Sequence, residues 1–173
     1  SADGRYVIAG SGDDKVYFFS RANNTPLWNY TTGDNAYAVD ISSDGKYIVA
    51  GTYAGSNIDP EVYLWESSSS TPLWNFTADK AVRSVSISAD GEYIVASTES
   101  PDDEEGDYDE NYGKVYLFDK DSSTPLWNYT FGSRVFAAIS EDGKFIAASG
   151  HDGNISLFSK DSSTPLWTYN SGS

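Results

Sequence analysis

The segment Ser-Thr-Pro-Leu-Trp-Asn-Tyr-Thr at residues 123–130 occurs in related form three more times in this chain of 173 residues. The copies share a Thr-Pro-Leu-Trp core that begins at Thr25, Thr71, Thr124 and Thr164, so they are 46, 53 and 40 residues apart. An Asp-Gly pair accompanies each copy, at residues 3–4, 44–45, 90–91 and 142–143. Two motifs that recur in the same order indicate one structural unit repeated along the chain.

The second unit is complete and shows what one repeat contains. Ala38–Ser42 alternates between apolar and polar residues, which predicts a strand with one buried face. Asp44-Gly45 fits a tight turn, and the almost wholly apolar Tyr47–Thr52 predicts a strand covered on both faces. Val62–Trp65 predicts a third strand, and Pro72–Thr77 a fourth at an edge, because proline cannot donate a ladder hydrogen bond. We name these strands A to D, from the inside outward.

The third and fourth units repeat this pattern, whereas the first unit lacks strand A. The predicted strands are Ser84–Ser88, Tyr93–Thr98, Val115–Phe118 and Pro125–Thr130 in the third unit, Phe136–Ser140, Phe145–Ser149, Ile155–Phe158 and Pro165–Tyr169 in the fourth, and Tyr6–Gly10, Val16–Phe19 and Pro26–Thr31 in the first. The sequence thus predicts one repeat array over residues 1–173. Its units are residues 1–37, 38–83, 84–135 and 136–173.

Unequal spacing between the copies has one source, the loop between strands B and C. This loop is short in the first and fourth units and lengthens to Tyr53–Glu61 in the second and Glu99–Lys114 in the third. Insertions confined to one loop type map to one face of a repeat array, often the binding face. The D–A loops emerge on the same face of a four-stranded unit, so we expect one loop-rich face.

Four-stranded units of this length resemble the blades of β-propellers. Val85–Ala96 resembles the A–turn–B signature of WD40-like repeats, and Val115–Trp127 is similar to the docking-tryptophan repeat of quinoprotein (PQQ-like) propellers. The His-Asp-Ser-Trp tetrad of WD40 blades is missing, since His151 is the single histidine, and Pro125 stands where the quinoprotein repeat has glycine. The resemblance implies an all-β propeller or half-propeller of about four four-stranded antiparallel blades, the first without strand A.

Four tryptophans occupy one position of the repeat: Trp28, Trp74, Trp127 and Trp167. This regularity predicts a structural role in which each indole wedges between its own blade and a neighbour. Such rings bury ~150–250 Å² each. Trp65 has no counterpart in the other units, so an exposed aromatic platform for a sugar or a cation stays open for it.

Composition excludes several classes of protein. The net charge of −15 and the pI near 4.1 argue against a nucleic-acid partner, because phosphate binding needs clustered Lys and Arg. The chain contains no cysteine, which excludes disulfides, thiolate metal sites and a cysteine nucleophile. No apolar run approaches the ~20 residues of a membrane helix, so we expect no membrane insertion in this segment.

An acidic stretch in the third unit is the candidate metal site. Carboxylates at this density could hold Ca²⁺, which takes oxygen ligands, although the spacing does not match an EF-hand loop. The alternative is a solvated, like-charged loop. The predicted ligands are Asp102, Asp103, Glu104, Glu105, Asp107 and Asp109. No other cofactor is expected.

The D–A loops supply a candidate partner-binding face. Arg83 and Arg134 could point at the mouth of the channel and bind an anion or a carboxylate of a partner, or they could neutralise the acidic surroundings. The residues predicted for this face are Asp34, Asn35, Asp79, Lys80, Arg83 and Arg134. Asn-x-Ser/Thr sequons at Asn23, Asn29, Asn75, Asn128 and Asn154 suit glycosylation and favour an extracellular or cell-surface location, although polar edge-strand residues would explain the repeated ones equally well.

No catalytic set is visible, because His151 lies in a predicted turn and no nucleophile elbow, phosphate loop or dinucleotide fingerprint occurs. We therefore expect a non-catalytic scaffold that binds a protein or glycan partner, as a fragment of a longer propeller protein. The alternative is a quinoprotein-like or metal-dependent enzyme domain. Because an open arc of blades leaves two uncovered end faces, we also expect two half-propellers to associate, or a partner strand to fill the first blade. The alternative is a ring that closes with four blades alone.

Overall fold

The computed structural model describes residues 1–53, 59–99 and 112–172, and these residues form fifteen strands in four antiparallel sheets, with no helix. Sheet 1 contains β1 (Tyr6–Ser11), β2 (Lys15–Ser20) and β3 (Pro26–Thr31), and sheet 2 contains β4 (Ala36–Ile41), β5 (Tyr47–Thr52), β6 (Glu61–Glu66) and β7 (Trp74–Thr77). Sheet 3 contains β8 (Ala81–Ile87), β9 (Tyr93–Glu99), β10 (Gly113–Asp119) and β11 (Trp127–Phe131). Sheet 4 contains β12 (Val135–Ile139), β13 (Phe145–Gly150), β14 (Asn154–Ser159) and β15 (Trp167–Asn170). The predicted all-β fold of about four antiparallel blades, the first with three strands, is confirmed.

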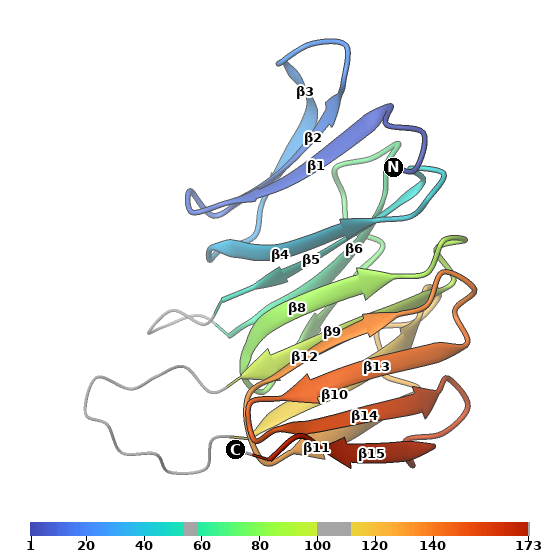
Figure 1. Cartoon of the computed structure of the whole chain (residues 1–173). Helices are drawn as coiled ribbons and strands as arrows, with labels where there is room; N and C mark the ends of the chain where they lie inside the picture. Colours follow the sequence, from blue (N-terminus) through green and yellow to red (C-terminus); the bar gives the residue numbers. More distant parts are fainter. Residues whose placement is uncertain (54–58, 100–111, 173) are drawn as a thin grey trace.

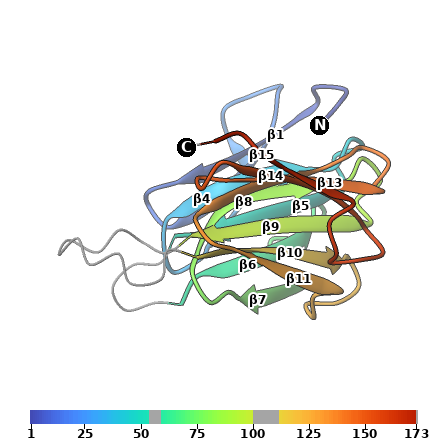
Figure 2. The ribbon, with the colours of Figure 1, turned by 60° about the horizontal axis from the view of Figure 1, so that its bottom comes forward.

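The four sheets stack in chain order, with sheet 1 at one end and sheet 4 at the other (Figure 1). The inner strands β4, β8 and β12 lie side by side along one side of the stack. Figure 2 shows the outer strands β7 and β11 on the side away from β4 and β8. A chain stacked in this way has two ends that differ from each other.

The outer strands begin later than the sequence suggested. In sheets 2, 3 and 4 they begin at the tryptophan of the repeat, because the preceding Pro-Leu pair lies outside the regular ladder. Only β3 begins at its proline, Pro26, beside a register shift between Phe18 and Phe19. Proline has no N–H to donate, so it fits the border of an edge strand better than its interior.

Each A–B turn is closed in the same way. In every unit the serine hydroxyl donates a 2.7 Å hydrogen bond to an aspartate Oδ1; the pairs are Ser1–Asp3, Ser42–Asp44, Ser88–Asp90 and Ser140–Asp142. The glycine that follows has a positive φ, +76° at Gly91, which glycine adopts without steric cost. A Cβ on Gly91 would lie 2.3 Å from the Tyr47 ring of the preceding sheet, so glycine is needed for packing as well.

These turns are also linked from sheet to sheet by main-chain hydrogen bonds. The amide of Ala2 donates to the carbonyl of Ser43 at 2.9 Å, Ser43 donates to Ala89 at 3.0 Å, and Ala89 donates to Glu141 at 2.9 Å. In each of these three bonds the earlier turn donates to the later one. The carbonyl of Ala2 in the first turn and the amide of Glu141 in the last turn therefore take no part in this series of bonds.

Apolar side chains fill the three spaces between successive sheets. The core between sheets 1 and 2 is built around Phe18 and Trp65, that between sheets 2 and 3 around Leu64 and Phe118, and that between sheets 3 and 4 around Leu117. Each inner sheet therefore contributes to two cores. The end sheets contribute to one core each, and this difference defines the surfaces described next.

Candidate interaction surfaces

Three of the repeated tryptophans bind the neighbouring sheet through the indole N–H. Trp28 donates to the carbonyl of Ser67 at 2.8 Å, Trp74 to that of Lys120 at 2.7 Å, and Trp127 to that of Lys160 at 2.8 Å. Each acceptor lies in the C–D turn of the next sheet. The structure therefore places these three indoles between sheets, as a directed contact from one blade to the next.

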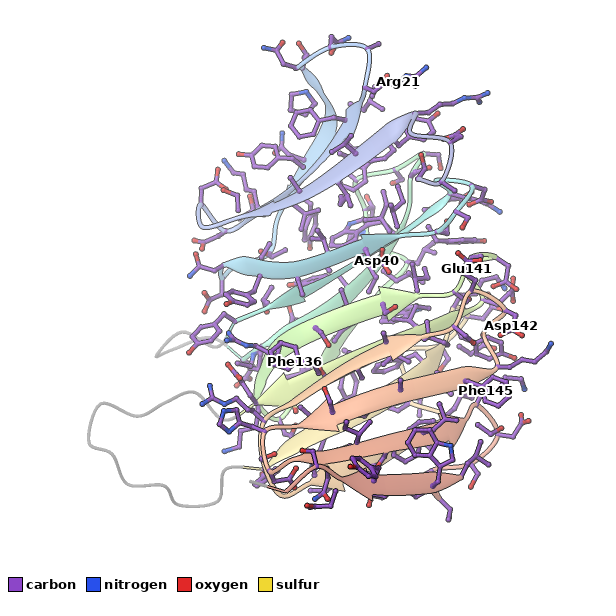
Figure 3. The ribbon with its side chains drawn as sticks, viewed as in Figure 1. Arg21, Asp40, Phe136, Glu141, Asp142 and Phe145 are labelled. Atoms are coloured by element: carbon purple, nitrogen blue, oxygen red, sulfur yellow. The ribbon has the colours of Figure 1, made fainter. Side chains whose placement is uncertain are left out.

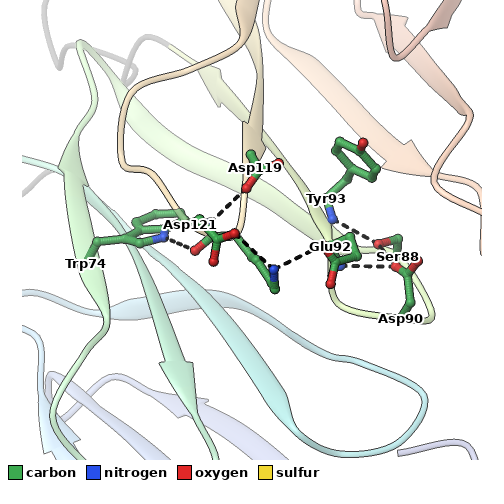
Figure 4. A network of polar contacts seen from close by, with 8 residues as sticks. Trp74, Ser88, Asp90, Glu92, Tyr93, Asp119 and Asp121 are labelled. Carbon is green, nitrogen blue, oxygen red and sulfur yellow. Dashed lines mark hydrogen bonds and ion pairs between the residues drawn. The ribbon is translucent and has the colours of Figure 1, made fainter.

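The acceptor turn of sheet 3 is itself held by charged groups (Figure 4). The ammonium of Lys120 lies 3.0 Å from Glu92 Oε2 and 3.1 Å from Asp121 Oδ2. Hydrogen bonds to Glu92 and then to Asp121 raise the pKa of Lys120 above its ordinary value. The turn that receives the Trp74 indole is thereby fixed by a charged network with the A–B turn of its own sheet.

Trp65 does not form an exposed platform. Its side chain is 0% exposed, and its Nε1–H donates to the carbonyl of Ser70 at 3.2 Å. The ring stacks with Tyr63 at a centroid distance of 5.3 Å and lies 6.0 Å from Trp28. Trp65 is a core residue between sheets 1 and 2, so the binding role that the sequence left open is wrong.

Sheet 4 ends the stack with an uncovered aromatic face. The exposed fractions are 45% for Phe145, 39% for Ile155, 51% for Trp167 and 62% for Tyr169. The counterparts of these residues in sheet 3 are Tyr93, Val115, Trp127 and Tyr129, which pack in the core shared with sheet 4. Trp167 therefore does not lie between two sheets as predicted, because the described residues contain no sheet beyond sheet 4. We call this surface the tail face.

Sheet 1 ends the stack on the opposite side. Its outward residues Val7, Ala9, Tyr17 and Phe19 correspond to Ile48, Ala50, Tyr63 and Trp65, the buried residues through which sheet 2 contacts sheet 1. Val7 is 49% exposed and the other three are half-buried. Figure 3 shows Arg21 at this end of the molecule and Phe145 at the other. We call this surface the head face.

At the loop-rich side, side chains of three inner strands form a row. The guanidinium of Arg83 in β8 lies 4.8 Å from the ring centroid of Tyr37 in β4 and 5.8 Å from that of Phe136 in β12. Its Nη1 lies 3.2 Å from Oε1 of the buried Glu99. Arg83 is thus held by Glu99 and by two aromatic rings.

Asp79 is the centre of a second cluster on the loop-rich side. Lys114 Nζ lies 2.5 Å from its Oδ2, and the Tyr116 hydroxyl donates to its Oδ1 at 2.6 Å. Burial opposes ionisation, but these two hydrogen bonds outweigh it and leave the pKa of Asp79 below its ordinary value. Burial and the Asp79 hydrogen bond raise the pKa of Tyr116. Lys80 lies 5.1 Å over the ring of Tyr112, beside this cluster.

A groove of about 390 Å³ opens between sheets 1 and 2 on the same side. It is lined by residues 10–12 of sheet 1, by Asn35, Ala36 and Tyr37 at the start of β4, and by Tyr53. The neighbouring Asp34 is buried and accepts a 2.6 Å hydrogen bond from the Asn35 amide. Of the predicted loop residues, Asn35 lines the groove and Asp34 precedes it in the chain. The main-chain carbonyl of the half-buried Arg134 accepts a hydrogen bond from the His151 amide at 3.0 Å.

The predicted Ca²⁺ ligands at residues 102–109 lie outside the described residues, so this site stays a prediction that Ca²⁺ titration calorimetry can test. Across residues 1–53, 59–99 and 112–172, no group of three or more His, Asp or Glu side chains is placed to hold a metal ion. The sequon residues Asn29, Asn75 and Asn128 lie exposed on outer strands, whereas Asn154 bonds to Asp152.

Comparison with protein families agrees with this architecture. Residues 129–159 match the family described as WD domain, G-beta repeat, known as WD40. The matched segment runs from β11 of sheet 3 through β12 and β13 into β14 of sheet 4, so it spans the junction between two blades. The match and the four antiparallel sheets together support a WD40-like propeller-repeat architecture. Such repeats generally act as non-catalytic scaffolds for protein interactions.

The search among curated proteins found no match. Within the described residues, nothing is helical, and so no helix long and apolar enough to cross a membrane occurs.

Proposed function

We propose that this chain is a non-catalytic scaffold that completes its array by pairing with a second copy, tail face to head face, and offers its loop-rich side to a protein partner. The uncovered tail face is the observation that carries the proposal. Its four exposed apolar residues repeat, position by position, the side chains with which sheet 3 covers sheet 4. A soluble protein rarely leaves such a face open, and the internal blade interfaces supply the template for covering it.

The head face offers acceptors at the corresponding places. Trp167 would donate its indole N–H to the carbonyl of Arg21, since Arg21 stands at the repeat position of the acceptors Ser67, Lys120 and Lys160. The Glu141 amide would donate to the carbonyl of Ala2, which continues the line of bonds between the A–B turns.

The aromatic contact at the A–B turn has a counterpart as well. Phe145 stands where Tyr6, Tyr47 and Tyr93 pack on the turn glycine of the next sheet. Gly4 of a second copy can take this ring, because a Cβ on Gly4 would meet nothing closer than Arg21 Nη1 at 4.0 Å. The proposed pair would thus repeat three contacts of the internal interfaces: the indole hydrogen bond, the hydrogen bond between A–B turns, and the aromatic ring on the turn glycine.

Light scattering after size-exclusion chromatography tests the pairing. We expect the wild-type chain to have twice its monomer mass of 18.8 kDa, and the double variant Phe145→Glu with Trp167→Ala to have the monomer mass. Leu166→Ala is the matched control, because Leu166 is 55% exposed yet its counterpart Leu126 stays 53% exposed beside a neighbouring sheet. A monomeric wild-type chain, or a double variant that still pairs, contradicts the proposal.

The loop-rich side supports the proposal of a protein partner, since it combines aromatic rings with cations that lie against them, at Arg83, Lys80 and Lys114, within an acidic protein. A glycan partner remains the alternative prediction. Binding to a glycan array that is lost in the variant Tyr37→Ala favours the glycan, and an array without binding leaves the protein partner.

A further inference from the structure

Three outer strands, β3, β7 and β11, carry the same acceptor sequence for an N-linked sugar. Each contains Asn-x-Thr with an aromatic residue in the middle: Asn29-Tyr30-Thr31, Asn75-Phe76-Thr77 and Asn128-Tyr129-Thr130. Side chains two residues apart share one face of a strand, so the amide and the hydroxyl of each copy lie on the same face. All six acceptor residues are exposed. The folded chain therefore presents both groups of the motif together at each of these strands.

The asparagines point away from the core that their own strand helps to build. In β11, Trp127 and Tyr129 pack in the core shared with sheet 4, so Asn128 between them points to the other face. Sheet 2 packs on that face of sheet 3, through Trp74 against Phe118 of β10, and yet Asn128 is exposed. A sugar on Asn128 would extend into solvent and leave the contacts between blades in place.

Asn75 has a polar neighbour that is compatible with a sugar. Its Nδ2 donates to Oε1 of Glu61 at 2.6 Å. The side-chain amide has two N–H groups, and an N-linked sugar replaces one of the two hydrogens. The remaining N–H can still donate to Glu61, so the modification does not leave this carboxylate without the bond.

The sequon at Asn154 lies in a different environment. Its Nδ2 donates to Asp152 Oδ2 at 2.8 Å, and its Oδ1 accepts from Asn170 at 2.9 Å. The hydroxyl of this sequon belongs to Ser156, which is 1% exposed and lies 2.8 Å from Thr168 Oγ1. β14 is also an interior strand of sheet 4, paired with β13 and β15. Transfer of a sugar to Asn154 would need a hydroxyl that the folded chain keeps buried.

We propose that Asn29, Asn75 and Asn128 are N-glycosylated and that Asn154 is not. The donor is an oligosaccharide linked to a lipid phosphate or diphosphate. In the transfer, Nδ2 forms a bond with C1 of the first sugar, and the bond between C1 and the phosphate oxygen breaks with its electron pair on that oxygen. The amide gives up one proton to a base, and no oxidation or reduction takes place.

This modification does not depend on the pairing of two copies. Asn75 and Asn128 are exposed although a preceding sheet packs on the same face of their sheets. A second copy on the head face would therefore leave Asn29 exposed as well.

Sugars at these positions would protect the outer edges of the sheets. β3, β7 and β11 are the last strands of sheets 1, 2 and 3, and an edge strand has unpaired main-chain groups to which another chain can add. A bulky, hydrophilic group beside such an edge opposes that addition. The outer strand of sheet 4 has Thr168-Tyr169-Asn170 at this place, so it lacks the motif and offers a matched control.

Mass spectrometry of peptides from the chain, isolated from the organism that makes it, tests the proposal. Electron-transfer fragmentation keeps sugars attached and so measures the added mass at each asparagine. We expect a saccharide mass on Asn29, Asn75 and Asn128, and unmodified Asn154.

Variants produced in the same cells test the role of the motif. Thr130→Ala should abolish the sugar on Asn128 and keep those on the other two strands, whereas Thr130→Ser should retain all three. Thr168→Asn combined with Asn170→Thr supplies the missing motif in β15 and should add a sugar at residue 168, with Asn128 as the reference for correct processing. An unmodified Asn29, Asn75 or Asn128, a sugar on Asn154, or a sugar on Asn128 that persists in Thr130→Ala would overturn the inference.

Discussion

Truncating Trp127 should reveal how strongly one indole couples two blades. In the folded chain its ring lies 5.6 Å from that of Phe158, and its Nε1–H bonds the Lys160 carbonyl at 2.8 Å. Trp127→Ala removes both contacts and leaves a cavity between sheets 3 and 4. Loss of a large buried aromatic side chain costs ~3–5 kcal/mol, of which the hydrogen bond accounts for ~1 kcal/mol.

The matched comparison is Trp167→Ala, at the same repeat position on the tail face. Trp167 is 51% exposed, so its removal from the single chain should cost less than ~1 kcal/mol. Both variants are measured by urea denaturation at a concentration below that of pairing, with tyrosine and remaining tryptophan fluorescence as the signal. Equal midpoint shifts for the two variants would refute the argument that the neighbouring sheet, rather than the blade itself, uses the indole.

Two further changes test the turns and the charged cluster. Gly91→Val places a Cβ 2.3 Å from the Tyr47 ring at a φ of +76°, so it should lower the denaturant midpoint by the equivalent of ~2–4 kcal/mol. The control is Gly132→Ala, which should leave the midpoint unchanged because the nearest atom to its Cβ lies 3.7 Å away. For Asp79 the folded pKa is lowered, so its stabilising contribution is present above the ordinary pKa and is lost as pH falls through the folded value. Asp79→Asn should therefore be less stable than wild type at neutral pH, with the difference shrinking in acid below pH ~4; a pH-independent difference in thermal midpoint would contradict this.

The repeat allowed much of the fold to be predicted from the sequence. Because each motif marks one strand or turn, four copies predict four sheets, and the absence of an apolar–polar stretch before Tyr6 predicts the three-stranded first sheet. Proline in the Pro-Leu-Trp motif also pointed to an outer edge strand. Its effect on the strand boundary was underestimated, since regular pairing in β7, β11 and β15 begins only at the tryptophan.

The candidate surfaces were harder to predict, because they depend on which side of a sheet has a neighbour. Trp65 was left open as an exposed platform and Trp167 was predicted to lie between two blades, yet Trp65 is covered by sheet 1, and none of the described residues covers Trp167. In the row of Tyr37, Arg83 and Phe136, the first two residues lie at the register shifts of β4 and β8. These shifts cannot be recognised from the spacing of the sequence motifs, so the row was not predicted.

Direction is the property of this chain that constrains its assembly most. Three repeated contacts between blades run one way: the indole at the repeat position donates to the next sheet, the A–B turn amide donates to the next A–B turn, and the aromatic ring that follows the A–B turn packs on the turn glycine of the next sheet. The proposed contact of tail face with head face follows this direction, whereas a tail-to-tail contact would bring the two Trp167 indole donors together without the acceptors that the internal interfaces provide. A head-to-tail contact either closes on itself or continues without limit. A closed pair uses both ends of both copies, and its second contact forms within the assembled complex at high effective concentration. A mass that stays at two chains over a wide concentration range indicates that the arc closes, whereas a mass that grows steadily with concentration indicates an open filament built from the same contact.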